Sequence, residues 1–153
     1  MWKVVAVSDF FENLFNHIHG AVTHFPIALP FVSVGVDYFA AKRPGLQGGA
    51  WLLLVLGSLG TVAATITGLV AHLAYEDDSV LLSAIDRHQY LGFATTALFV
   101  GLTAWSSMRR GDVGGSRAYL VVALVGLAVL ALTGFLGGNL LTEWGIGVKG
   151  ITR

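Results

Sequence analysis

The chain contains no cysteine among its 153 residues. This absence excludes disulfide bonds, cysteine-ligated iron–sulfur clusters and haem attached through a Cys-x-x-Cys-His motif. A metal ion or a haem would therefore have to be held by histidine, with Asp, Glu or Met as lesser options.

Charged residues are also scarce. They make up 12% of the chain, against about a quarter in a soluble domain. Hydrophobic residues make up 55%, and the mean hydropathy is +0.74. This composition indicates an integral membrane protein, and the length suits one domain. The zero net charge and the lack of a basic tract argue against a nucleic-acid partner.

Four segments are long and apolar enough to cross a bilayer, which takes about 20 residues. They are residues 21–41, 50–73, 84–107 and 117–136. Short loops make consecutive segments antiparallel. The sequence therefore predicts an all-α fold, an integral membrane up-down four-helix bundle over residues 21–148. Residues 1–20 are interpreted as a short amphipathic interfacial helix or a frayed leader, and residues 149–153 as a tail.

The charged residues predict an orientation. The bases that gather at one end of the bundle are Lys42, Arg43, Arg109, Arg110 and Arg117. The other end carries acidic residues, with Arg87 as the only base in a short loop there. The positive-inside rule then places the basic end in the cytoplasm and both termini in the periplasm of a bacterial inner membrane. Asp37, near the basic end, is expected to pair with Lys42, Arg43 or a base of the other cytoplasmic loop.

All five histidines are predicted to lie at the acidic end, at similar depth. They are His17, His19, His24, His72 and His88. An ionisable side chain at a membrane boundary is costly unless something binds it. We therefore expect some of them to share a ligand site. His17 is expected to lie in the wet interface, and for His19 this position is the alternative to a ligand role.

Small residues share helical faces with three of these histidines. The predicted inward faces are His24 with Ala28, Phe31 and Gly35, His72 with Gly68, Thr65 and Thr61, and His88 with Gly92 and Thr95. Small residues are normal where membrane helices pack, so no cofactor is needed to explain them. In the functional interpretation, Gly68 and Gly92 leave space for a flat ring.

Two motifs frame the chain. The first is His19-x-x-x-x-His24-Phe25-Pro26-Ile27-Ala28-Leu29, followed by Asp37, and the second is Gly137-Gly138-Asn139-Leu140-Leu141-Thr142-Glu143-Trp144-Gly145-Ile146-Gly147-Val148. They resemble the opening and the ending of the bacterial membrane proteins grouped as domain of unknown function 2231, which also tend to place a histidine where His88 falls. Gly20 stands where that family usually has proline, and Thr142 where it usually has tyrosine.

The resemblance implies a four-helix membrane protein of uncharacterised activity. Members of that family occur beside or fused to redox domains, such as Rieske proteins and sugar dehydrogenases. This association favours electron transfer over transport.

The first functional hypothesis is a protein that binds haem b and relays electrons at the periplasmic face. His24 and His88 are the preferred axial ligands, because haem in a bundle takes imidazoles from different helices. His72 could replace either ligand or bind a propionate, and Arg87 is placed to pair with a propionate. The electron partners would be a quinol and a periplasmic electron carrier, with this chain as a subunit or membrane anchor of a larger redox complex.

Two alternatives stay open. One is a Cu or Zn site formed by three or four of His19, His24, His72 and His88, with Glu76 or Asp86 nearby. The other is a structural or assembly subunit whose histidines line a lipid, quinone or partner surface. No nucleophile–base pair is visible, so an accessory subunit is favoured over a stand-alone enzyme.

Overall fold

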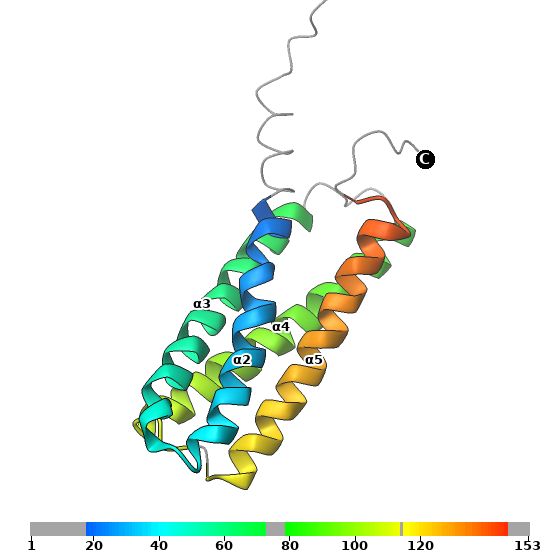
Figure 1. The fold of residues 1–153 in the computed structure, drawn as a ribbon. Helices are drawn as coiled ribbons and strands as arrows, with labels where there is room; N and C mark the ends of the chain where they lie inside the picture. The colour runs from blue at the N-terminus through cyan, green and yellow to red at the C-terminus, as the bar shows by residue number, and fades with distance from the viewer. Residues whose placement is uncertain (1–17, 73–78, 114, 147–153) are drawn as a thin grey trace, which may run out of the picture.

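A computed structural model describes residues 18–72, 79–113 and 115–146. Its helices are α2 (His24–Ala40), α3 (Gln47–His72), α4 (Ser79–Met108) and α5 (Arg117–Thr142), with the short 3-10 helix η1 (Pro44–Leu46) before α3. They stand side by side as an up-down bundle (Figure 1), and the described residues contain no strand. The predicted all-α four-helix membrane bundle is confirmed.

All four helices can cross a bilayer. The spans are Ile18–Ala40, Pro44–His72, Val80–Met108 and Arg117–Thr142. Their outer faces expose large apolar side chains such as Leu59, Ile66 and Phe135, which suit contact with lipid. Most of the interfacial segment predicted over residues 1–20, and the predicted tail, lie outside the described residues.

The fourth helix is longer than the sequence predicted. It runs through Gly137 and Gly138 and ends at Thr142, whereas the apolar pattern placed its end at residue 136. Inside a bilayer the backbone has no water to bond, so intrahelical hydrogen bonds outweigh the low helix propensity of glycine. The extra turns carry Gly137, which packs against His88, and Gly138, which lines the cavity described below.

Proline and glycine set the contact between α2 and α3. A Cβ atom at Gly57 would lie 2.9 Å from Cδ of Pro30, and one at Gly60 would lie 3.1 Å from Cδ of Pro26. The two glycines therefore let the two proline rings approach the backbone of α3 closely. This contact fixes which face of α2 points into the bundle.

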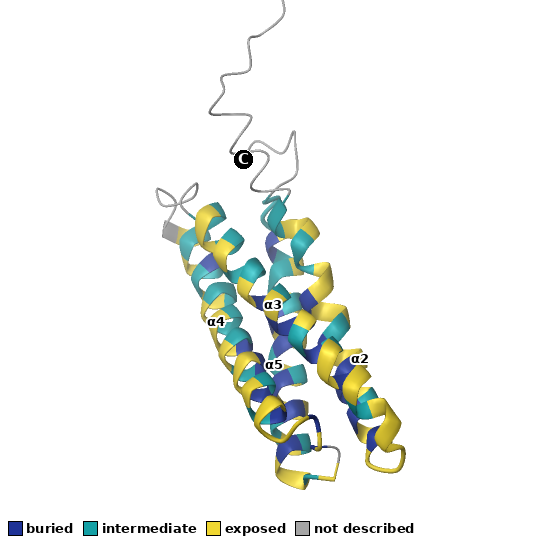
Figure 2. Cartoon of the chain, turned by 90° about the vertical axis from the view of Figure 1, so that its left-hand side faces the viewer, coloured by how far each residue is buried: buried dark blue, intermediate teal, exposed yellow. Residues whose placement is uncertain are grey.

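The solid core lies in the half of the bundle next to the basic turns. Leu54, Phe99, Leu102 and Tyr119 are almost fully buried there. Figure 2 shows that buried residues concentrate in this half, whereas half-buried and exposed residues dominate toward the other end. Large side chains thus fill one half and leave the other open.

Asp37 corrects one expectation from the sequence. Its Oδ2 accepts a hydrogen bond of 3.0 Å from the hydroxyl of Tyr119, and Trp105 packs edge-on against that ring at 5.7 Å. In the described part of the chain, no Lys or Arg forms an ion pair with Asp37. Lys42 and Arg43 lie beyond the end of α2 and are exposed, whereas Asp37 faces the bundle axis with 3% of its surface exposed.

Candidate functional site: a histidine-lined cavity

A cavity of about 630 Å³ opens between the four helices at the end opposite the basic turns. Cavities of this size are typical of small-molecule and cofactor sites. Its wall is mostly apolar and rich in small residues, and it includes His19, His24, His72 and His88. The helix order therefore brings four histidines to one site, as the sequence predicted, although they play different parts in its wall.

His19 is fixed by a threonine of α3. Its Nδ1 lies 3.1 Å from Oγ1 of Thr67. The Thr67 hydroxyl donates its own hydrogen to the carbonyls of Ala63 and Ala64, at 3.0 and 3.1 Å. Because that hydrogen is already used, Thr67 accepts and Nδ1 of His19 donates. The neutral ring therefore keeps its lone pair on Nε2.

His88 reaches the same state through a backbone group of α5. Its Nδ1 lies 3.0 Å from the carbonyl oxygen of Thr133, which can only accept a hydrogen bond. Nδ1 therefore carries the hydrogen, and Nε2 of the neutral ring carries the lone pair. The side chain of Thr133 donates to the carbonyl of Val129 at 2.8 Å and meets the hydroxyl of Thr95 at 3.0 Å.

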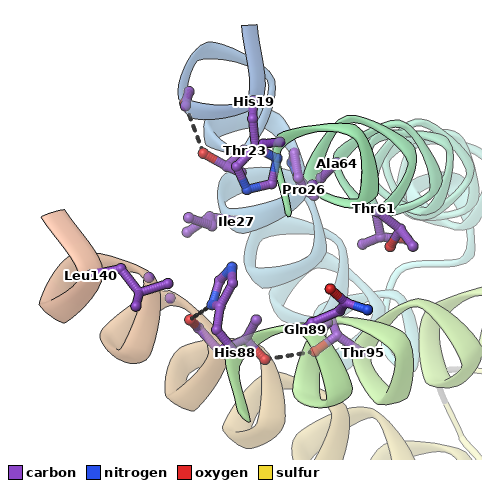
Figure 3. A pocket seen from close by; sticks show the side chains of 18 of the residues that line it. His19, Thr23, Pro26, Ile27, Thr61, Ala64, His88, Gln89, Thr95 and Leu140 are labelled. Atoms are coloured by element: carbon purple, nitrogen blue, oxygen red, sulfur yellow. Dashed lines mark hydrogen bonds between the residues drawn. The ribbon is translucent and has the colours of Figure 1, made fainter. Parts of the chain in front are cut away.

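The two imidazoles point toward one another across the cavity (Figure 3). Their ring centroids are 6.3 Å apart, and the ring planes are at 82°. Each ring packs against a glycine of a neighbouring helix. A Cβ atom at Gly68 would lie 3.0 Å from Cε1 of His19, and one at Gly137 would lie 2.9 Å from Cε1 of His88. Both rings are thus held from the side and the back, and among residues 18–72, 79–113 and 115–146 the hydrogen bonds of the two rings are made through Nδ1.

The two glycines singled out from the sequence have different surroundings. Gly68 gives room to the ring of His19, where the sequence paired it with His72. Gly92 lines the cavity one turn beyond His88, and a Cβ atom there would meet nothing within 4 Å. Of the two, Gly92 is the one that adjoins open space.

His24 does not face inward as the sequence predicted. It is exposed, and its Nδ1 lies 3.2 Å from the carbonyl oxygen of Ala21. Phe31 and Gly35, expected on the same inward face, are exposed as well. The expected face is wrong because Pro26 and Pro30 pack against α3 and turn the other side of α2 inward. His24 lines only the outer edge of the cavity.

His72 occupies the rim of the cavity at the end of α3. Its Nδ1 is hydrogen-bonded to Oε1 of Gln89, and its Nε2 lies 3.9 Å from Oδ1 of Asp86. Arg87 is exposed and does not line the cavity. His17 and Glu76, also named from the sequence, lie outside the described residues.

The sequence left open a Cu or Zn site formed by three or four histidines. Structural and catalytic zinc sites take three or four protein ligands. Within residues 18–72, 79–113 and 115–146, no group of three or more His, Asp or Glu side chains is placed to hold a metal ion. The structure brings His19 and His88 together, while His24 and His72 are hydrogen-bonded to other partners.

Comparison with known proteins identifies the family but no relative of known activity. No curated protein and no solved structure matches the chain. The family model described as "Predicted membrane protein (DUF2231)" matches residues 16–150, which include all four helices and the cavity. This match confirms the resemblance seen between His19 and Val148. The chain therefore belongs to the DUF2231 family of predicted membrane proteins.

Proposed function

We propose that this protein binds haem b through His19 and His88 and relays electrons across the outer part of the membrane. The observation that carries the proposal is the pair of opposed imidazoles on different helices. Each donates its Nδ1 hydrogen to a protein oxygen and presents an Nε2 lone pair to the cavity. A metal-bound histidine almost always makes such a second hydrogen bond, which fixes its tautomer and its ring orientation.

The spacing of the rings also supports a metal between them, because a metal–imidazole bond is about 2 Å long. The centroids of His19 and His88 are 6.3 Å apart. A haem bound there would supply reversible one-electron transfer, and the protein would set its potential through the two imidazoles.

The cavity wall suits a flat apolar ring with a polar edge. Among its described lining residues there is no Lys or Arg, so the carboxylates of haem would lie toward the aqueous rim. His72 lies at that rim and would be the residue to contact a propionate there. Arg87 is exposed on α4 one residue before His88 and would reach a propionate only from the water-facing side.

The charge distribution supports a periplasmic position for the cavity. The bases of the two turns at the opposite end are all exposed, and the positive-inside rule assigns that end to the cytoplasm. The protein would then be a subunit or membrane anchor of a redox complex in a bacterial inner membrane. A quinol or a periplasmic electron carrier would be its partner.

Spectroscopy of the detergent-purified protein titrated with hemin tests the proposal. We expect a Soret band and, on reduction with dithionite, the sharp α band of low-spin bis-histidine haem. His19→Ala and His88→Ala should each abolish the low-spin spectrum. His24→Ala, in an exposed histidine of the same cavity edge, is the matched control and should retain it. A flat spectrum at saturating hemin, or loss in His24→Ala alone, would refute the assignment.

A hydroquinone is a second candidate ligand. A hydroxyl group of such a ligand is a hydrogen-bond donor, and Nε2 of His19 or of His88 is an acceptor for it in a mostly apolar wall. Binding of a short-chain hydroquinone by the hemin-free protein, lost in His19→Ala and His88→Ala, together with a flat hemin titration, would favour this ligand over haem.

A further inference from the structure

The four helices form four seams around the cavity, and three of them are closed by hydrogen bonds. His19 joins the first span to α3 through Thr67. Thr65 and Thr96 join α3 to α4 at 2.8 Å, and the His72–Gln89 bond joins the same two helices at the rim. His88 joins α4 to α5 through the carbonyl of Thr133. Side chains cannot part at these seams without breaking polar contacts inside the membrane.

The seam between α2 and α5 differs. The one hydrogen bond between these helices in the described residues is Tyr119–Asp37, near the basic turns and far from the cavity. At the level of the cavity, the contact is apolar and loose. A Cβ atom at Gly134 would lie 3.9 Å from Cδ1 of Ile27 and would meet nothing else within 4 Å. No polar contact of the described residues holds α2 and α5 together there.

On each side of this seam, a row of residues along one face of the helix lines the cavity and is also exposed at the surface. On the first span, Gly20, His24 and Ile27 line the cavity and are exposed. On α5, Gly138 and Leu141 do the same, one and two turns beyond Gly134. Exposed residues that line the cavity mark where it meets the outside. Leu69 of α3 and Phe93 of α4 meet the same criterion, but those two helices are joined by the Thr65–Thr96 and His72–Gln89 hydrogen bonds. The cavity therefore opens sideways through a slot between α2 and α5.

The slot runs from the outer ends of the helices inward. On α5, which ends at Thr142, Leu141, Gly138 and Gly134 lie about 2, 6 and 12 Å from that end. Phe31 and Phe135 flank the inner end and are 44% and 64% exposed. Because the spans expose large apolar side chains to the bilayer, the inner end of the slot faces lipid.

We propose that the slot between α2 and α5 is a lateral entrance through which haem passes edge-on from the bilayer to His19 and His88. The row from Gly20 to Ile27 is about 10 Å long, and the contact of Ile27 with Gly134 closes its inner end. The identity of the ligand rests on the proposed function, whereas the opening of the slot to lipid does not.

The opening can be tested without any ligand, because the chain has no cysteine of its own. A spin label on Gly138→Cys, in ligand-free protein in lipid nanodiscs, should collide with dissolved oxygen more often than with a water-soluble nickel chelate. Gly101→Cys on the exposed face of α4 serves as the lipid reference, and Gly45→Cys in the turn before α3 as the water reference. A Gly138 label that matches the Gly45 reference, or that is shielded from both reagents, would overturn the slot.

A bulky side chain in the slot tests whether hemin enters the cavity through it. Gly138→Trp should slow hemin uptake by ligand-free protein in nanodiscs at least tenfold. Gly101→Trp is the matched control, because a side chain at either glycine meets nothing within 4 Å. A bulky maleimide added to the folded Gly138→Cys protein repeats the block if the tryptophan variant does not fold.

The outcomes separate the two proposals. Equal uptake rates with and without the block would overturn the lateral entrance and leave haem binding intact. No uptake by the unsubstituted protein would refute the proposed function and with it the identity of the ligand. The spin-label result would then still decide whether the slot opens to lipid.

Discussion

In the half of the bundle next to the basic turns, Phe99, Leu102 and Tyr119 fill the space between the helices. In the other half, the same four helices enclose a cavity of about 630 Å³. Both halves contain buried polar groups. In the packed half the polar groups satisfy each other, as Asp37 and Tyr119 do. In the open half, the hydrogen bonds that the described residues make to His19 and His88 use only the Nδ1 atom of each ring. The half that lacks large side chains is therefore also the half in which each imidazole has a second nitrogen for a ligand.

The largest effect on stability is expected from a substitution that creates a cavity in the packed half. Phe99 is fully buried, so Phe99→Ala should lower the free energy of unfolding by about 3–5 kcal/mol. Phe93→Ala removes a cavity-lining ring on the same helix that is 37% exposed, and it should cost much less. Chemical denaturation in detergent micelles measures both variants. Equal losses would mean that the two halves do not differ in packing.

The second-largest effect is expected from adding a side chain at Gly137, which packs against His88. Gly137→Val places atoms where Cε1 of His88 lies, since even a Cβ atom there would be 2.9 Å away. We expect the imidazole to be displaced and the low-spin haem spectrum to be lost, with the helix content unchanged. Gly92→Ala is the control, because its Cβ atom has open space. Haem spectra and circular dichroism report the two properties separately, and an intact low-spin spectrum in Gly137→Val would contradict this account.

A smaller effect is expected from the residue that positions His19. Thr67→Val removes the acceptor of the Nδ1 hydrogen while keeping the shape of the side chain, and loss of such an outer partner costs about 10–100-fold in metal affinity. Thr67→Ser keeps the hydroxyl and should restore hemin affinity. The midpoint potential should also shift in Thr67→Val, which a purely structural role would not require. Unchanged affinity and potential would remove Thr67 from the site.

The smallest effect should come from the polar pair of the packed half. Tyr119→Phe leaves Asp37 without its donor and should lower the free energy of unfolding by about 1–3 kcal/mol. Hemin affinity should stay unchanged, because the pair lies at the far end of the bundle. A fall in affinity without a fall in stability would show that the two halves are coupled.

Sequence reasoning predicted the bundle and the gathering of histidines because both follow from hydrophobic length and from short antiparallel connections. It assigned the wrong face of α2 because it placed His24 inward. The buried residues Asp37, Ser33, Pro30 and Pro26 recur at helical spacing, and this pattern continues back to His19. A carboxyl group inside a membrane span is expected to face the other helices and not the lipid. A prediction of the inward face that began from Asp37 would therefore have chosen the face that the structure shows.

The role of the glycines was not predictable from the sequence. Gly68, Gly92 and Gly137 look alike in the printed chain, and small residues are common wherever membrane helices meet. Their different functions depend on which ring lies opposite each of them, at Cβ distances such as 3.0 Å for His19 and 2.9 Å for His88. Such contacts depend on the rotation of each helix about its axis, which hydropathy does not specify.

The two prolines of α2 have a mechanical consequence. Proline has no backbone N–H, so Pro26 and Pro30 leave the carbonyls of Val22 and Pro26 without their helical donors. The helix that follows His19 therefore lacks two of its backbone hydrogen bonds, at Pro26 and Pro30. The hydrogen bond between His19 and Thr67 holds the first turn of the span against α3. The position of that turn thus depends on a side chain of the cavity wall as well as on the helix backbone.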